Sequence, residues 1–267
     1  MHTTSKSVIF IPSKNRADKQ TTYEILKSLG LEKQTYIVVE PQEEKTYKSR
    51  GYRVLVLPEN DRGISFSRNF ILDFCREQGI EYCLQMDDDV RSFYRKDETT
   101  GKMKADNEAF LEALEIFENP SMKIAYMGLE YQQFAWASEK PFTKGRGIEV
   151  IHFMHLPKIP KGLKFDQNTK EDKDFCIQCL LSGVQTTKVN YIAMSVPSIG
   201  TNAGGLHEFY ATKKDNVASI YMLQKWGNRI IKIKEKKDGA RIDAMVQWRE
   251  LPKIRAERIA KLKKGIK

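Results

Sequence analysis

The sequence predicts an α/β fold in which a mostly parallel sheet is flanked by helices. Over the first 90 residues, short apolar runs alternate with amphipathic segments, a pattern typical of parallel strands joined by helical crossovers. Polar residues follow each apolar run. Because ligands of such sheets bind beyond the carboxyl ends of the strands, we expect the functional site at that edge. A length of 267 residues is ample for one large core.

Stop signals bound the elements of the first 90 residues. Pro12 closes the first apolar run and Gly30 follows the first helix. Phe66, Phe70 and Phe74 recur every fourth residue, which predicts an amphipathic helix. In chain order we predict strand 7–11, helix 17–29, strand 36–39, strand 53–57, helix 65–79 and a strand that begins at Ile80. The polar residues after the four strands are Ser13 and Arg16, then Glu40, then Asn60 and Arg62, then Asp87, Asp88 and Asp89.

The second half of the chain has a less regular pattern. We predict a loop at 91–104, a helix at 106–117, extended stretches at 123–131 and 147–155, a helix ending at Gly183 and a strand at 190–196. The connection 132–146 is rich in aromatic residues, including Phe134 and Trp136, and is interpreted as a mobile lid or an acceptor-binding wall. Since no clean linker is present, we expect the second half to extend the same sheet. The expected units are a single domain at 1–250, with halves 1–90 and 91–250, and a basic helix at 251–267.

Three consecutive carboxylates, Asp87, Asp88 and Asp89, end the fourth predicted strand. On an extended chain Asp87 and Asp89 share one side while Asp88 points away. Two neighbouring anions coexist comfortably when a cation lies between them, and oxygen ligands suit a divalent metal ion that holds a diphosphate. A solvated acidic turn is the alternative interpretation. The apolar run before the triplet favours a metal site.

A second acidic group, Glu171, Asp172 and Asp174, heads the helix that ends at Gly183. Acids at a helix N-terminus are favoured by the helix dipole and by unpaired backbone N–H groups, so capping is one interpretation. The other is that one of these acids is a general base, which requires reach to a hydroxyl group.

A glycine-containing segment near the end of the second half, Thr201–Asn202 with Gly204 and Gly205, is followed by His207. Paired glycines let the backbone approach a ligand, and the imidazole is a candidate contact to a metal or a phosphate. A structural role is the alternative for His207. It is the preferred one for His152 and His155, which lie on opposite faces of a predicted strand.

The net charge of +10 indicates an anionic partner, and more than half of the excess lies in the tail from Leu251 to Lys267. This tail holds seven basic residues and one acid, Glu257. Its apolar positions Ile254, Ile259 and Leu262 predict an amphipathic helix docked on the body. The outward charge forms either a solvated face or a nucleic-acid surface.

The cysteine pattern and the hydropathy indicate the cellular compartment of the protein. Cys75, Cys83, Cys176 and Cys179 lie among apolar residues, and buried free thiols are favoured over zinc or disulfides because no second CxxC pair is present. No apolar run is long enough to span a bilayer and no signal-peptide pattern begins the chain, so we expect a cytoplasmic protein.

The order of these motifs resembles the GT-A fold of nucleotide-sugar glycosyltransferases, with its Rossmann-type sheet. The resemblance rests on Pro12 to Arg16, Glu40, the Ser67–Arg68–Asn69 helix, the aspartate triplet, the Glu171–Asp172 pair and His207. It implies that residues 1–90 bind the nucleotide and that residues 91–250 carry the acceptor and the catalytic acid. It implies also that Pro12, Ser13, Arg16 and Glu40 hold the uridine of a UDP-sugar, that Arg68 and Asn69 place the nucleotide-sugar, and that Asp88 faces the ribose or the sugar.

The same resemblance implies a Mn²⁺ or Mg²⁺ ion held by Asp87, Asp89 and His207 across the diphosphate, where charge grows on the leaving UDP. If the enzyme inverts configuration, Asp172 is the first choice and Glu171 the second for the base that deprotonates the acceptor hydroxyl. The three-aspartate form and the crowded run Glu171–Phe175 depart from the family pattern.

Within that fold family the chain is similar in overall character to the TET-associated glycosyltransferases of bacteriophages, and the expected compartment is the host cytoplasm if the protein is phage-encoded. This similarity implies transfer of a sugar to the hydroxyl of a hydroxymethylated pyrimidine, such as hydroxymethylcytosine, in DNA, with Phe134 and Trp136 available to stack on an exposed base. Two alternatives are a glycosyltransferase for a surface glycan or protein, and a nuclease that uses the aspartates for two metal ions. A nucleotidyltransferase is disfavoured because the loop after Pro12 lacks glycines. The donor sugar, the stereochemical outcome and the oligomeric state stay open.

Overall fold

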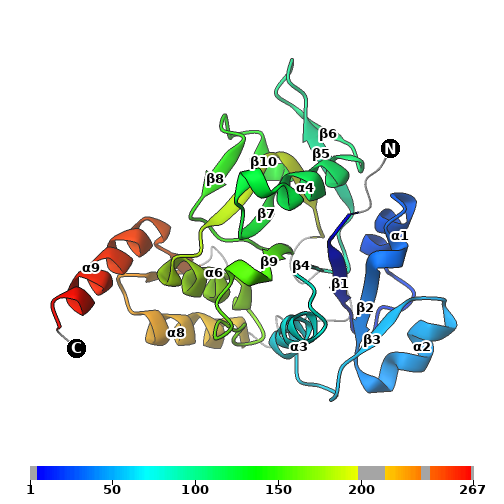
Figure 1. Cartoon of the computed structure of the whole chain (residues 1–267), viewed down its shortest axis with the longest axis horizontal. Coiled ribbons are helices and arrows are strands. Elements are labelled where there is room, and N and C mark those ends of the chain that lie inside the picture. Colours follow the sequence, from blue (N-terminus) through cyan, green and yellow to red (C-terminus); the bar gives the residue numbers. More distant parts are fainter. Residues whose placement is uncertain (1–4, 198–213, 236–240, 266–267) are drawn as a thin grey trace.

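Most of the chain forms one sheet covered by helices on both faces. The computed structural model describes residues 5–197, 214–235 and 241–265 (Figure 1). The strands of the large sheet are β1 (Val8–Pro12), β2 (Thr35–Val39), β3 (Val54–Val56), β4 (Tyr82–Met86), β5 (Ser92–Lys96), β6 (Met103–Ala105), β7 (Tyr126–Tyr131), β8 (Phe142–Lys144), β9 (Ile151–His155) and β10 (Thr186–Ser195). Their order is β3-β2-β1-β4-β9-β7-β10-β5-β6, and β8 lies beside β10.

The direction of the strands changes along the sheet. β1 pairs in parallel with β2 and β4, and β2 with β3, as predicted for the N-terminal part. β9 is antiparallel to both β4 and β7, so β7 runs in the same direction as β4, and β10 is parallel to β7. β5 and β6 add antiparallel strands at the far side. The expected α/β fold, with a second half that extends the same sheet, is therefore confirmed.

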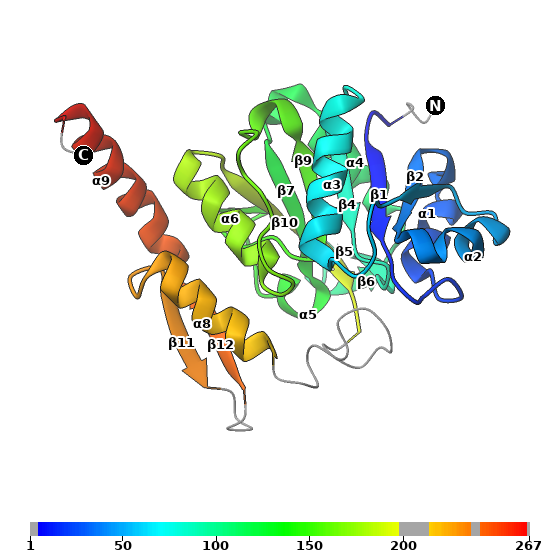
Figure 2. The same ribbon diagram turned by 90° about the horizontal axis from the view of Figure 1, so that it is seen from below.

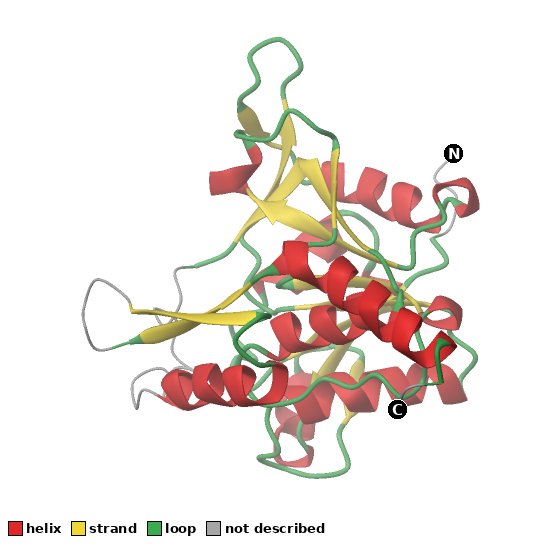
Figure 3. Cartoon of the chain, turned by 90° about the vertical axis from the view of Figure 1, so that its left-hand side faces the viewer, coloured by secondary structure: helices red, strands yellow, loops and turns green. Residues whose placement is uncertain are grey.

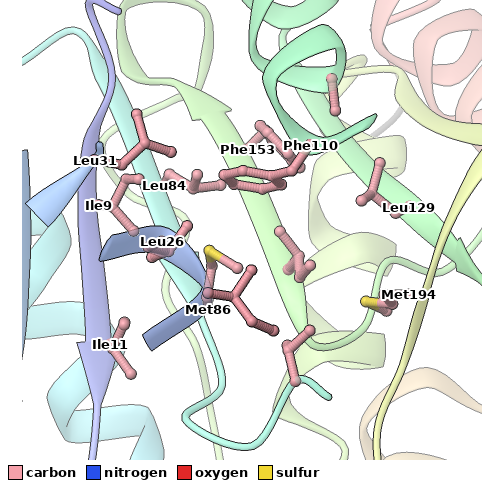
Figure 4. Close-up of a cluster of buried hydrophobic side chains, with 14 of the residues drawn as sticks. Ile9, Ile11, Leu26, Leu31, Leu84, Met86, Phe110, Leu129, Phe153 and Met194 are labelled. Atoms are coloured by element: carbon pink, nitrogen blue, oxygen red, sulfur yellow. The ribbon is translucent and has the colours of Figure 1, made fainter. Parts of the chain in front are cut away.

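Side-chain alternation in the strands builds a core on each face of the sheet. Ile9 and Ile11 point into one core and Phe10 into the other. Helices α1 (Thr21–Ser28) and α4 (Ala109–Glu118) pack on the first face, and α3 (Ile64–Glu77) and α6 (Glu171–Ser182) on the second (Figure 2). The first core brings strand residues such as Leu84 and Phe153 against α1 and α4 (Figure 4). Short helices α2 (Glu44–Ser49) and α5 (Gln132–Ala135) lie in connections.

The C-terminal residues form a small unit beside α6. It comprises α8 (Lys214–Trp226), the two-stranded sheet β11 (Ile231–Glu235) and β12 (Ile242–Val246), and α9 (Leu251–Lys263) (Figure 3). Ile177 and Leu180 of α6 share an apolar cluster with this unit, including Ile254 of α9. The C-terminal helix was predicted to pack on the body of the protein, and only the first turns of α9 do so. Ile259 is 37% exposed and Leu262 is 75% exposed, because α9 extends away from the body (Figure 2).

The structure differs from the sequence prediction in two connections. Residues 91–104, predicted as a loop, contain the hairpin of β5 and β6, and the 132–146 connection contains α5 and β8. β5 pairs with β10, which lies far along the chain, so no local pattern marks it. Among the described residues, no helix is long and apolar enough to cross a membrane.

Candidate active site

The aspartate triplet lies at the carboxyl edge of the sheet. β4 ends at Met86, and Asp87 to Asp89 form the turn that follows. Thr22 at the start of α1 fixes this turn, since its hydroxyl donates to the Asp87 carbonyl at 2.6 Å and accepts from the Val90 N–H at 2.9 Å. The alternation expected of an extended chain therefore stops at Met86, and the side chains of the triplet have separate partners.

Asp88 binds two residues of the loop that follows β1. It is 4% exposed, and its carboxylate accepts hydrogen bonds from the Ser13 hydroxyl at 2.6 Å and from the Arg16 guanidinium. Arg16 also lies 3.4 Å from Asp89. The structure thus brings Ser13, Arg16, Asp88 and Asp89 together. Contact of Asp88 with ribose or sugar stays a prediction.

Glu40 is held beside this group at the end of β2. Its side chain is 7% exposed, and its carboxylate accepts from the Lys14 ammonium at 2.9 Å and from the Asp61 N–H at 2.9 Å. Pro12 is the last residue of β1, next to Ser13. The predicted uridine-binding residues therefore line one end of the carboxyl edge, where β1 and β2 terminate.

Arg68 joins the two acidic groups that the sequence keeps far apart. This arginine of α3 is 2% exposed; it donates to Asp87 at 2.8 Å and its Nε lies 3.4 Å from Glu171 at the start of α6. Burial is the largest cause that raises the pKa of Asp87 to about 7; Arg68 opposes it, and Asp89 and Glu171 add to it. Burial and then the charge of Asp172 raise the pKa of Glu171 to about 7. The aspartate turn and the helix α6 acids thus form one electrostatic unit.

The three acids of α6 have different surroundings. Burial and then the charge of Glu149 raise the pKa of Asp172 to about 6. Within the described residues, the ion pair with Arg68 is made by Glu171 and not by Asp172. Asp174 points toward α8, where it accepts from Trp226 at 2.7 Å and from Lys225 at 3.0 Å. Asp174 therefore has a structural role that ties α6 to α8. Asp172 and Glu171 stay as the candidates for the general base.

Sequence reasoning missed a buried charged triad next to Asp172. Lys188 of β10 is 8% exposed and lies 3.2 Å from both Glu130 and Glu149. Burial alone would lower the pKa of Lys188, but Glu149 and Glu130 raise it above its ordinary value. The sequence feature that could have revealed this triad is Lys188, the single charged residue of the run Thr186–Ser195. The triad lies along β7 itself, since Lys188 pairs with Gly128 and Glu130 is the second-last residue of the strand.

Asn69 contacts protein backbone on both sides of its amide. Its Oδ1 accepts from the Phe165 N–H and its Nδ2 donates to the Phe165 carbonyl, each at 2.8 Å. The pair of bonds attaches α3 to the segment that leads into α6. Asn69 thereby positions the acids of α6, whereas direct contact with the nucleotide-sugar stays a prediction.

Replacing Asn69 by aspartate is expected to lower the free energy of unfolding by about 1 to 3 kcal/mol. The carboxylate still accepts from the Phe165 N–H, but it cannot donate to the Phe165 carbonyl and leaves that group unpaired. Urea unfolding followed by circular dichroism measures the change. Asp73→Asn, on the exposed side of the same helix, is the control and should stay within about 0.5 kcal/mol of wild type. Equal stability of both variants would contradict the role of Asn69.

The metal site stays a prediction. Asp87 and Asp89 carry hard oxygen donors of the kind that a divalent ion prefers. Burial is the largest cause of the raised pKa of Asp87, so the shift is not evidence for a metal. Within residues 5–197, 214–235 and 241–265, no group of three or more His, Cys, Asp or Glu side chains is arranged to hold a metal ion. His207 and the preceding Thr201–Gly205 segment lie outside the described residues, so the predicted third ligand stays a prediction.

The four cysteines, His152 and His155 have contacts typical of structural residues. All four cysteines are buried and free, as expected. His152 is buried, with its Nδ1 2.6 Å from the Tyr126 hydroxyl, and burial lowers its pKa well below the ordinary value. His155 stacks on Tyr82 at a ring distance of 4.6 Å.

The α/β sheet and its acidic carboxyl edge agree with the class of protein that the resemblance implied, a glycosyltransferase. The chain belongs to the TET-associated glycosyltransferase family, whose model matches residues 7–205. The matched range contains the loop after β1, Arg68, the aspartate turn and the Glu171–Asp172 pair. No curated protein matches the chain.

Solved structures with a similar arrangement have low sequence identity. The crystal structure of mannose-1-phosphate geranyltransferase from Thermus thermophilus is 13% identical, with a TM-score of 0.37, and the match covers 69% of this chain and 58% of that chain. A putative nucleotide-diphospho-sugar transferase from Desulfovibrio desulfuricans is 8% identical over 69% of this chain and 80% of that one, with a TM-score of 0.44. CMP:2-keto-3-deoxy-manno-octonic acid synthetase complexed with CTP is 10% identical over 83% of this chain and 100% of that one, with a TM-score of 0.45.

Proposed function

We propose that this glycosyltransferase moves a sugar from a UDP-sugar to the hydroxyl of a 5-hydroxymethylpyrimidine in DNA, in a reaction that depends on Mn²⁺ or Mg²⁺. The observation that carries the proposal is the bridge from Asp87 through Arg68 to Glu171. It joins the aspartate turn, which we propose to hold the diphosphate through a metal ion, to the acids that we propose for deprotonation. Family membership supports the sugar-transfer chemistry.

The donor is proposed to bind across the ends of β1, β2 and β4. Pro12, Ser13, Arg16 and Glu40 would hold the uridine, and Arg68 would lie behind the diphosphate. Asp87 and Asp89, with His207, would hold the divalent ion, which when bound supplies positive charge against the leaving diphosphate. Arg68 is fully charged and pre-positioned, so it stabilises the acidic cluster without rearrangement during the reaction.

Asp172 is proposed as the general base, with Glu171 second. A base must be deprotonated and must reach the acceptor hydroxyl. Glu171 is buried against Arg68, which restricts its reach, while Asp172 is partly exposed and its pKa of about 6 leaves it ionised at neutral pH. The proton of the acceptor hydroxyl would pass to the Asp172 carboxylate as the hydroxyl oxygen attacks the sugar.

The acceptor is proposed to enter beside α5. This helix begins directly after β7, at the carboxyl edge. Phe134 of the helix is 57% exposed and Trp136, the residue that follows it, is 66% exposed. Exposed aromatic rings next to a catalytic edge suit stacking on an unpaired base. A pyrimidine extruded from DNA would place its hydroxymethyl group toward Asp172.

The test is a direct assay of base modification. The protein is incubated with Mn²⁺ or Mg²⁺, a panel of UDP-sugars and DNA that contains hydroxymethylcytosine, and the nucleosides are weighed by mass spectrometry. A metal-dependent gain of one sugar mass on the modified base is expected. UDP release without a DNA adduct across the panel contradicts the acceptor, and DNA cleavage without UDP-sugar binding contradicts the whole proposal in favour of a nuclease.

A further inference from the structure

A pocket of about 650 Å³ opens at the edge of the sheet opposite the aspartates. It lies where β7 and β10 begin and α6 ends, and it is lined in part by Lys123, Lys144, Lys158, Ser182 and Thr187. Because β7 and β10 run in the same direction as β4, their first residues lie away from the carboxyl edge that carries Asp87. The donor site and this pocket are therefore separate places on the molecule.

The described residues that line the pocket are basic, polar or apolar, and no acid is among them. Lys123, Lys144 and Lys158 are exposed, and none of the ion pairs found in the described part of the chain involves them. Arg255 of α9 approaches the wall, since a side chain added at Gly183 would come within 2.5 Å of its guanidinium. Uncompensated cations gathered around a cavity favour an anionic ligand with more than one charge.

The distance to the catalytic edge sets a minimum size for a ligand that uses both places. Helix α6 runs from Glu171, beside Arg68, to Ser182 in the pocket wall, and its 12 residues span about 18 Å at 1.5 Å each. One nucleotide in the active site cannot reach the pocket. In a DNA strand, with a phosphate about every 3.4 Å of helix axis, the length corresponds to about five nucleotides.

The segment from α5 to β8 connects the two places. Phe134 and Trp136 are exposed at the catalytic edge, Lys140 is exposed farther along, and β8 pairs Phe142 with Val189 and Lys144 with Thr187 at the pocket. Aromatic rings followed by cations are the two elements with which proteins hold a nucleic-acid strand. Glu139 is the single acid between Gln132 and Arg146.

The course of this segment is fixed before any ligand binds. The Asn190 Nδ2 lies 2.7 to 2.9 Å from the Ser138 hydroxyl, the Lys140 carbonyl and the Thr143 hydroxyl, and these three acceptors share its two N–H groups. These bonds attach the segment to the irregular part of β10, where its register with β7 shifts. A preformed surface binds a strand without the entropic cost of ordering its own loop.

We propose that the lysine pocket binds backbone phosphates of the acceptor DNA a few nucleotides away from the base in the active site, with the segment 134–144 as the track between them. This rests on the proposed DNA acceptor. The pocket then contributes affinity for DNA that is long enough to reach it and contributes nothing for a shorter acceptor.

The experiment compares two triple variants that lose the same charge. Lys123→Gln, Lys144→Gln and Lys158→Gln together alter the pocket. Lys27→Gln, Lys33→Gln and Lys45→Gln together alter exposed lysines of the N-terminal half and are the matched control. Each protein is tested with a hydroxymethylcytosine dinucleotide and with an oligonucleotide of about 20 nucleotides, which exceeds typical single-strand site sizes. Fluorescence anisotropy at several salt concentrations gives the affinity, and sugar transfer gives kcat and KM.

The pocket variant is expected to bind the long oligonucleotide at least about tenfold more weakly, with a salt slope of log K that is smaller by about 2 to 3. Its loss should be confined to the long acceptor, and the control variant should stay within about twofold of wild type. An unchanged affinity and slope, an equal loss in the control variant, or an equal loss with the dinucleotide overturns the pocket proposal while the acceptor stands. Absence of DNA binding by the wild-type protein overturns both.

Discussion

Replacing Asp89 by alanine is expected to lower kcat for sugar transfer by at least about a thousandfold, because a metal-bound carboxylate supports several kcal/mol of transition-state stabilisation. The fold should survive this change. Asp89 is 26% exposed, and Arg16 keeps its closer contact with Asp88 when Asp89 is truncated. Asp87→Ala is the less clean test, since it removes a partner of the buried Arg68 and would also destabilise the protein.

The Asp89 prediction is checked by transfer assays across a Mn²⁺ titration and by thermal unfolding of the same preparation. Asp73→Ala is the control, because Asp73 is a surface acid with 50% of its side chain exposed, near the end of α3 that leads back to the start of β4. Full activity of the Asp89 variant at saturating Mn²⁺ would remove the metal assignment. Loss of activity together with a collapse of the unfolding temperature would instead assign Asp89 to the fold.

The elements that were predictable from sequence are those whose signals are local. β1, β2 and β4 are short apolar runs with stop signals, and α3 shows its period of four in three phenylalanines. Parallel strands place their carboxyl ends together, so the polar residues after each strand could be assigned to one edge without coordinates. The grouping of Ser13, Arg16 and Asp88 agrees with that argument.

Contacts across long separations could not be read from sequence. The bridge by Arg68 between Asp87 and Glu171 depends on how α3 and α6 pack side by side on one face of the sheet. The triad of Lys188, Glu130 and Glu149 depends on the pairing of β10 with β7. A salt bridge leaves no periodic pattern, whereas an apolar face does, and for this reason the core was easier to predict than the polar network.

Replacing Asp172 by asparagine is expected to lower kcat by about 10²- to 10⁴-fold, the usual contribution of a general base. The donor KM should change little, because the Arg68 bridge uses Glu171. Glu171→Gln is the matched variant. It removes the negative partner of a buried arginine, so we expect lower stability and a higher donor KM, with the base still present.

The pH profile separates these two roles. A base acts in its deprotonated form, so activity should rise with pH and reach a plateau above the pKa of the base. Burial raises the pKa of Asp172 to about 6 and that of Glu171 to about 7, and the pair shares its titration, so the acid limb of kcat is expected between pH 6 and 7. Glu171→Gln should keep the acid limb of kcat, with its midpoint at lower pH, because a negative charge near Asp172 is gone. The residual activity of Asp172→Asn should show no acid limb. The reverse pattern, with the limb kept by Asp172→Asn and lost by Glu171→Gln, would identify Glu171 as the base.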